Sequence, residues 1–242
     1  MKKVSKFASA ITNVIIITML LTLTLVSFSG QYSSFVFTQS NDRPYYKGNT
    51  TRGEVALMIN VYWGTEYLDG MLDTLAKHNA KATFFVGGTW AAKNKEYLDK
   101  MIEGGHELGN HGYFHKDHAK LNAKQNEAEI TSTNTLVKGL TGYDITLFAP
   151  PSGSFSDTTL KVAYAQGMSV IMWSRDTIDW RDKDSSLVYS RATNKIGAGD
   201  MILMHPTAHT LAALGDILTY YEKNSLTPVT VSQIISQADN AI

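Results

Sequence analysis

The sequence predicts an α/β protein: a deformed (β/α) barrel preceded by an N-terminal export segment. Two observations support this prediction. Strand-like apolar runs alternate with runs of helical periodicity over about 190 residues, which is typical of a parallel sheet with right-handed crossovers. No Gly-rich phosphate-binding fingerprint follows the first strand-like run, which disfavours a dinucleotide-binding sheet. We therefore expect a barrel of eight repeats or fewer.

The composition sets limits on what the chain does. With 242 residues, of which 43% are hydrophobic and 18% charged, the chain is long enough to bury a sizeable core and is not a disordered chain. The absence of cysteine excludes disulfide scaffolds, thiolate metal sites and cysteine nucleophiles. Beyond the first six residues, 19 Lys and Arg stand against 22 Asp and Glu. We expect no nucleic-acid partner, because a weakly acidic body binds polyanions poorly.

Residues 1–29 are predicted to direct export. Three lysines within the first six residues precede an uncharged run over 7–41, as in a secretory signal peptide. Small residues before Gly30 allow cleavage after Ser29, but the apolar run is also long enough to cross a hydrocarbon core of about 30 Å. A cleaved signal peptide and a retained membrane anchor therefore both stay open. Either one places the body outside the cell, in the cell wall or at the extracellular face of the membrane.

The rest of the chain is predicted to be a linker followed by one domain. Residues 30–52 are polar and rich in Ser, Asn, Gly and Tyr, whereas residues 53–242 carry the alternating pattern. Strands are predicted at 55–61, 82–86, 107–111, 145–149, 169–173 and 201–205. Helices are predicted at 66–79, 91–103, 123–140, 157–166, 185–196 and 208–224, and the last apolar run, 229–235, begins a strand or a helix. The strand-like runs are almost continuously apolar, as expected for a sheet covered on both faces.

The most unusual polar residues follow the predicted strands. In α/β barrels the chemistry lies at the carboxyl ends of the strands, so we expect these residues to face one mouth. They are Asn60 to Trp63 after the first strand, His111 and His115 after the third, Pro150 to Ser152 after the fourth, Asp176, Asp179 and Trp180 after the fifth, and His205 at the end of the sixth.

His111 and His115 are candidate ligands of one metal ion. Two imidazoles four residues apart can reach a single zinc ion at about 2.0–2.1 Å per bond, although this spacing also occurs by chance. Asp117 and His118, just beyond the pair, are interpreted as solvated loop residues.

His205 ends an apolar strand, where an imidazole needs a hydrogen-bonding partner. Asp179 is the expected partner, because a carboxylate on one ring nitrogen orients the other and raises its basicity. A purely structural Asp–His pair is the alternative. Trp180 is interpreted as a platform for a sugar ring, with a core position as the alternative.

Several stretches together resemble the polysaccharide deacetylases, the NodB-homology domains of carbohydrate esterase family 4. The similarity covers residues 54–235, and within the family the Trp63-Gly64 pair resembles the branch from Gram-positive sporulating bacteria. The stretches are KATFFVGG at 81–88, EGGHELGNHGYFH at 103–115, FAPPSGSF at 148–155, WSRDTIDW at 173–180 and ILMH at 202–205.

The resemblance implies a NodB-like deformed barrel that removes acetyl groups from N-acetylated cell-wall polysaccharide, such as peptidoglycan or a chitin-like polymer. In this family one Asp and two His hold a divalent metal, usually zinc, which polarises the amide carbonyl and a water. A second Asp is the base, and a His protonates the leaving amine. The resemblance assigns the metal ligands to His111 and His115 and the general acid to His205, oriented by Asp179. The predicted sugar contacts are Trp63, Pro150, Trp180 and Leu203, with Leu203 facing the acetyl methyl.

The chain departs from the family pattern at three positions. Asn60 stands in place of the catalytic base, and a neutral amide cannot take up the proton. Val61 stands in place of the metal-ligating Asp, and Ala149 replaces the Arg that pairs with the base. The three losses are mutually consistent, because an Arg left beside a missing carboxylate would be an unpaired charge.

Two histidines alone make a weak zinc site, since catalytic zinc normally has three protein ligands. Glu66 and Asp117 are the candidates for a third. Two hypotheses follow. One is an exported, metal-dependent N-deacetylase, with activity reduced or its site rebuilt. The other is a catalytically inactive glycan-binding protein at the cell envelope. A structural envelope domain without a ligand is a third class.

Overall fold

The computed structural model describes residues 17–19, which are helical, and the folded body, residues 43–236. No helix in these two ranges is both long enough and apolar enough to cross a membrane. The predicted export segment, residues 1–29, lies outside the described residues except for 17–19. Cleavage after Ser29 and retention as an anchor therefore both stay predictions.

One parallel sheet organises the body. Its strands are β1 (Glu54–Val61), β2 (Ala82–Val86), β3 (Glu107–Asn110), β4 (Leu147–Phe148), β5 (Ser169–Val170), β6 (Arg175–Asp176), β7 (Met201–Met204) and β8 (Thr227–Val229). They follow the order β5-β4-β3-β2-β1-β7-β6, and β8 pairs with the start of β1. In the described body, β5 and β6 are consecutive in the chain but end the two sides of the path. The sheet is thus a curled half-barrel, which confirms the predicted α/β class.

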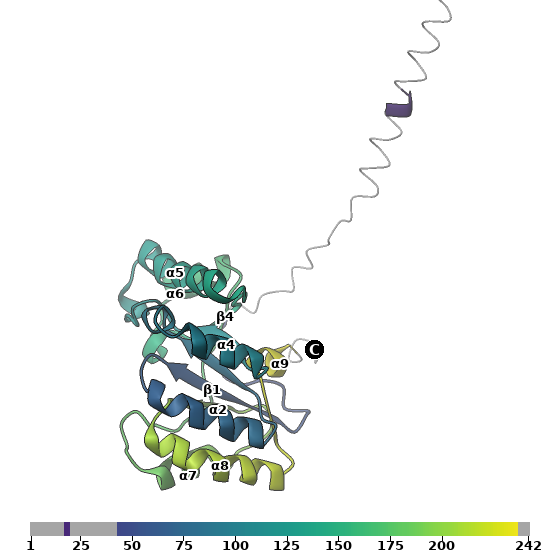
Figure 1. The fold of residues 1–242 in the computed structure, drawn as a ribbon. Helices are drawn as coiled ribbons and strands as arrows, with labels where there is room; N and C mark the ends of the chain where they lie inside the picture. Colours follow the sequence, from purple (N-terminus) through teal and green to yellow (C-terminus); the bar gives the residue numbers. More distant parts are fainter. Residues whose placement is uncertain (1–16, 20–42, 237–242) are drawn as a thin grey trace, which may run out of the picture. The chain divides into compact units, whose positions relative to one another are not determined.

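Helices cover the outer face of this sheet (Figure 1). They are α2 (Leu68–Lys77), α3 (Gly88–Ala91), α4 (Lys95–Glu103), α5 (Ala123–Thr141), α6 (Asp157–Ala165), α7 (Ser185–Thr193), α8 (Ala208–Lys223) and α9 (Val231–Ile235), with 3-10 turns η1 (Thr65–Tyr67), η2 (His118–Lys120) and η3 (Pro151–Gly153). In Figure 1, α5, α4, α2 and α8 lie in that order across the body. The order of the helices follows the order of the strands, as expected for successive right-handed crossovers.

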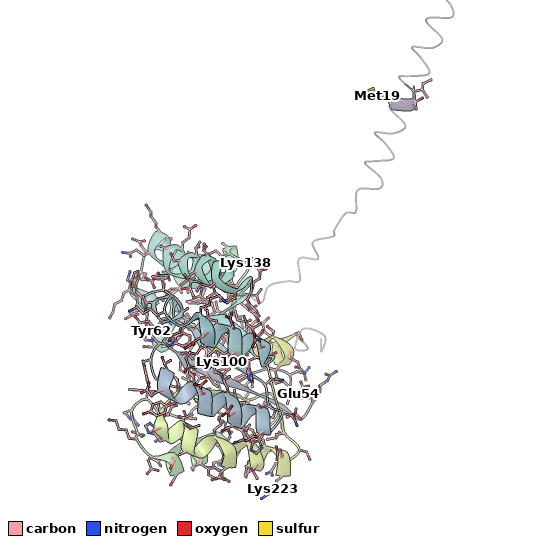
Figure 2. All side chains as sticks on the ribbon, viewed as in Figure 1. Met19, Glu54, Tyr62, Lys100, Lys138 and Lys223 are labelled. Carbon is pink, nitrogen blue, oxygen red and sulfur yellow. The ribbon has the colours of Figure 1, made fainter. Side chains whose placement is uncertain are left out.

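Alternation along β1 decides which side chains reach the inside of the curl. Leu57, Ile59 and Val61 belong to the outer core beneath the helices, whereas Met58 belongs to the inner cluster. Because successive side chains of a strand point to opposite faces, Asn60 continues the inner face and Val61 the outer one. Figure 2 labels Glu54 and Tyr62 at opposite sides of the body, near the two ends of this strand.

Several predicted elements differ in extent from those observed. The strands predicted at 145–149 and 169–173 are reduced to β4 and β5, two residues each. After β4 the chain enters Pro150 and Pro151, which have no N–H to donate to a ladder. The helix predicted at 91–103 divides into α3 and α4 around Asn94, whose amide hydrogen-bonds the Trp90 carbonyl. The last apolar run contains both alternatives, the end of β8 and then α9.

The described end of the predicted linker contacts the body. Tyr45 forms a parallel bridge to Ile171, just after β5, with its N–H donated to the Val170 carbonyl at 2.9 Å. Lys47 pairs with the buried Asp200 at 3.0 Å. Residues 45–47 thus lie along the side of the curl where β5 and β6 leave it open.

A buried polar link fastens α9 to the sheet and gives a first prediction. The Thr83 hydroxyl donates to Glu107 at 2.7 Å and accepts from the Val231 N–H at 2.8 Å. Thr83→Val keeps the shape but leaves that N–H without a partner, so we expect a loss of about 1–3 kcal/mol in the free energy of unfolding. Urea denaturation measures it. Thr219→Val, on a partly buried hydroxyl that bonds only within α8, is the control and should cost clearly less.

Candidate functional site

A cavity of about 450 Å³ opens where the strands end. It is lined by Asn60, Tyr62, Trp63, His111, His115, Ser152, Trp173, Asp176, Trp180, Leu203 and His205. These residues come from β1, β6 and β7 and from the loops after β1, β3, β4 and β5. Residues separated by up to 145 positions thus meet because parallel strands deliver their carboxyl ends to one edge.

Most of the predicted site residues lie at this cavity, but Pro150 does not line it. Pro150 is buried and begins the turn η3, and Ser152, two residues on, reaches the cavity instead. Asp179 lies behind His205 rather than in the lining.

Four lining residues were not assigned a role from the sequence: Tyr62, Ser152, Trp173 and Asp176. Tyr62 lies two residues after Asn60, so the period of β1 is the signal that could have found it. Trp173 was placed inside a predicted strand, and the early end of β5 freed it to line the cavity. Asp176 was expected at the mouth, but nothing in the sequence gave it a chemical role.

His111 is held in one tautomer. Its Nδ1 lies 2.8 Å from the Ala149 carbonyl oxygen, which can only accept, so Nδ1 carries the proton and Nε2 keeps its lone pair. Burial, reinforced by the neighbouring His115, lowers the pKa of His111 to about 3. The imidazole is therefore neutral.

His115 is placed by an unusual loop. Gly112 and His115 both have positive φ, 72° and 53°, and the two histidine rings lie 5.0 Å apart between centroids. The buried Glu129 accepts hydrogen bonds from the backbone N–H groups of Tyr113 and Phe114 at 2.9 and 2.7 Å. A carboxylate on α5 thus fixes the loop that carries His115.

Asp179 and His205 form the predicted pair. The Asp179 carboxylate accepts from His205 Nδ1 at 2.7 Å, from the His205 backbone N–H at 2.6 Å and from the Thr210 hydroxyl at 2.6 Å. Burial alone would raise the pKa of Asp179, but these hydrogen bonds hold it below its ordinary value. The carboxylate is ionised, so Nδ1 of His205 carries its proton and Nε2 is the ring nitrogen left for the cavity. Trp63 stacks on this ring, 5.9 Å away and only 5° from parallel.

The positions that depart from the family pattern are each accounted for by the fold. Asn60 lines the cavity. Val61 is fully buried in the outer core, on the opposite face of β1. Ala149 is fully buried in the inner cluster, and its carbonyl holds His111.

The two residues proposed as a third metal ligand are not grouped with the histidines. Within residues 17–19 and 43–236, no three His, Asp or Glu side chains are arranged to hold a metal ion. Glu66 is exposed on η1, and Asp117 is committed to Lys120 and Ser154. The donor set at this cavity, two imidazoles and a neutral amide, does not fit a catalytic zinc site with three protein ligands.

One interpretation of the sequence was wrong. His118 is not a solvated loop residue but is fully buried, with Nδ1 bonded to Asn126 at 2.7 Å and its ring packed on Phe148. The turn η2 and the start of α5 bring these residues together, which the local sequence did not indicate.

Comparison with known proteins identifies the family. The polysaccharide deacetylase family model matches residues 47–171. The chain belongs to the polysaccharide deacetylase family. Its fold matches the crystal structure of a pseudoenzyme of carbohydrate esterase family 4 from Bacillus anthracis, with a TM-score of 0.77 and 35% identity over 80% of this chain and 69% of that one.

Curated relatives include both characterised and uncharacterised proteins. The uncharacterized protein YlxY of Bacillus subtilis is 40% identical over 80% of this chain and 61% of its own length. A peptidoglycan-N-acetylglucosamine deacetylase of Bacillus cereus is 32% identical over 67% of this chain and 59% of its own. The chain thus spans about three fifths of the length of these relatives.

Proposed function

We propose that this chain is a catalytically inactive member of its family that binds N-acetylated cell-wall polysaccharide in the cavity. One observation carries the proposal: β1 turns Asn60 into the cavity and Val61 into the outer core. The positions of the usual base and of the third metal ligand are thereby both without a carboxylate. The similarity to the Bacillus anthracis pseudoenzyme supports this proposal.

The binding surface that remains is suited to sugars. Three indoles line the cavity, those of Trp63, Trp173 and Trp180, and two of them are about half exposed. Flat aromatic faces bury the apolar faces of sugar rings, while hydroxyl groups find acceptors such as the free Nε2 of His205. We propose export to the cell wall as the setting, since relatives such as the Bacillus cereus enzyme are named for acting on peptidoglycan.

A second candidate is a metal-dependent N-deacetylase whose site has been rebuilt. The observations that favour it are the intact His111–His115 pair and the Asp179–His205 pair. In the absence of a positioned base, such an enzyme would lose a factor of about 10²–10⁴ in rate.

Acetate release and zinc binding separate the two candidates. With the full chain, added zinc and an N-acetylglucosamine tetramer, we expect no acetate above the uncatalysed background. We expect zinc to bind only weakly in calorimetry and this binding to be lost in His111→Ala. His78→Ala, which removes a histidine paired with Glu222 outside the cavity, is the matched control and should bind zinc as the parent does.

Tryptophan fluorescence tests the binding half of the proposal. We expect the emission to change on titration with the tetramer, because Trp63 and Trp180 are exposed at the cavity. Acetate release at an enzymatic rate, or tight zinc binding that depends on His111, would favour the deacetylase. No response to any glycan would favour a structural domain without a ligand.

A further inference from the structure

The side chain of Asn60 is a buried amide that the protein does not hold. The residue is only 5% exposed, yet it lines the cavity. Its Oδ1 is buried and has no hydrogen-bond partner among the described residues. Such atoms are rare in folded proteins, and each calls for an explanation, such as a ligand that pairs with it.

The surroundings of Asn60 are uncharged and partly apolar. Asn60 and His205 directly follow Ile59 and Met204, which are partners in the ladder between β1 and β7. Leu203, 3% exposed, lines the same cavity. No lysine or arginine is among the lining residues, and the one carboxylate there, Asp176, accepts the Ile178 N–H at 2.8 Å.

An acetamido group matches these features one by one. It is neutral, and it offers an N–H donor, a carbonyl acceptor and a methyl group. An asparagine amide pairs with another amide through one donor and one acceptor, and a half-turn of its terminal torsion exchanges the two ends. A carboxylate in the same place could only accept. A free amine, protonated at neutral pH, has donors only and must lose its hydration to enter a buried site.

We propose that Asn60 is the specificity-determining residue of the cavity: it pairs with the acetamido group of a bound sugar and thereby distinguishes N-acetylated units from units that carry a free amine. This inference rests on the proposed glycan binding. In place of a base that would help remove the acetyl group, the chain has a group that recognises it intact.

Paired ligands test this inference. The dissociation constants of the N-acetylglucosamine tetramer and of the fully de-N-acetylated glucosamine tetramer are measured with the full chain by calorimetry, without added metal. We expect the parent to prefer the acetylated tetramer by about tenfold or more, the usual effect of leaving a buried polar group unpaired. Equal affinity, or preference for the free amine through Asp176, would overturn the proposal.

Two variants assign the preference to Asn60. Asn60→Leu fills the same space without polar atoms, and we expect it to lose most of the preference while its melting temperature stays the same or rises. Asn60→Asp should lose the preference or reverse it, because a carboxylate attracts an ammonium group. If both variants keep the parent's ratio of affinities, Asn60 does not read the acetyl group.

Trp180→Ala separates this inference from the function on which it rests. Stacking on an indole does not depend on the nitrogen substituent, so this variant should weaken both tetramers by a similar factor. An unchanged preference in Asn60→Leu together with weakened binding in Trp180→Ala would refute the role of Asn60 and leave glycan binding intact. Binding of neither tetramer by the parent would refute both.

Discussion

Asn60→Asp, Val61→Asp and Ala149→Arg introduced together are expected to create zinc-dependent acetate release that the parent chain lacks. The triple variant supplies the base, the third ligand and the basic partner that the family pattern implies, next to His111 and His115. A positioned base alone is worth about 10²–10⁴ in rate, so the gain over the parent should be at least a hundredfold. The measurement is acetate release from an N-acetylglucosamine tetramer, with zinc and with a chelator.

The structure predicts that the three substitutions are interdependent. Val61 and Ala149 are fully buried in two different apolar clusters, so Val61→Asp alone buries an unpaired charge and should cost roughly 3–5 kcal/mol of folding stability. Urea denaturation of each variant therefore accompanies the kinetics. A parent chain already as fast as a folded triple variant would contradict the proposed inactivity. A mutant of the Bacillus anthracis pseudoenzyme is described as having restored enzymatic activity, which shows that such a site can be recovered in a protein 34% identical to this one.

Asp179→Ala is expected to be among the most destabilising single substitutions at the site. It removes the acceptor for the His205 ring, the His205 backbone N–H and the Thr210 hydroxyl at once. Removing one partner from a buried, charge-assisted network typically costs about 3–5 kcal/mol. Urea denaturation at pH 7 measures this loss. Asp179→Asn, which keeps one acceptor oxygen, is the matched control and should lose less; equal losses in both variants would show that charge, and not hydrogen bonding, dominates.

The same carboxylate predicts how stability depends on pH. The folded state lowers the pKa of Asp179 from its ordinary value of 3.8. The ionised form therefore contributes stability that is fully present above about pH 4 and is lost as pH falls through the folded-state pKa. The parent should lose stability more steeply than Asp179→Asn below pH 4. Parallel acid limbs for the two proteins would contradict the assignment.

Much of the site could be predicted because its chemistry is written in local patterns. His111 and His115 follow one apolar run and His205 ends another, and the end of a parallel strand is where such residues meet. Pro150 and Trp173 could not be placed, because their positions depend on where β4 and β5 stop. That in turn depends on two prolines and on Tyr45, which lies more than a hundred residues away.

The sequence by itself determined the class of fold, the family and the chemical identity of the departures at positions 60, 61 and 149. These follow from periodicity and residue type, which are properties of the chain alone. Only the tertiary structure decided that Asn60 points into the cavity without a partner while Val61 lies in the core, that Glu66 and Asp117 are not grouped with the histidines, and that His118 is buried. Each of these depends on which surfaces pack together when the sheet curls, and that packing joins residues far apart in the chain.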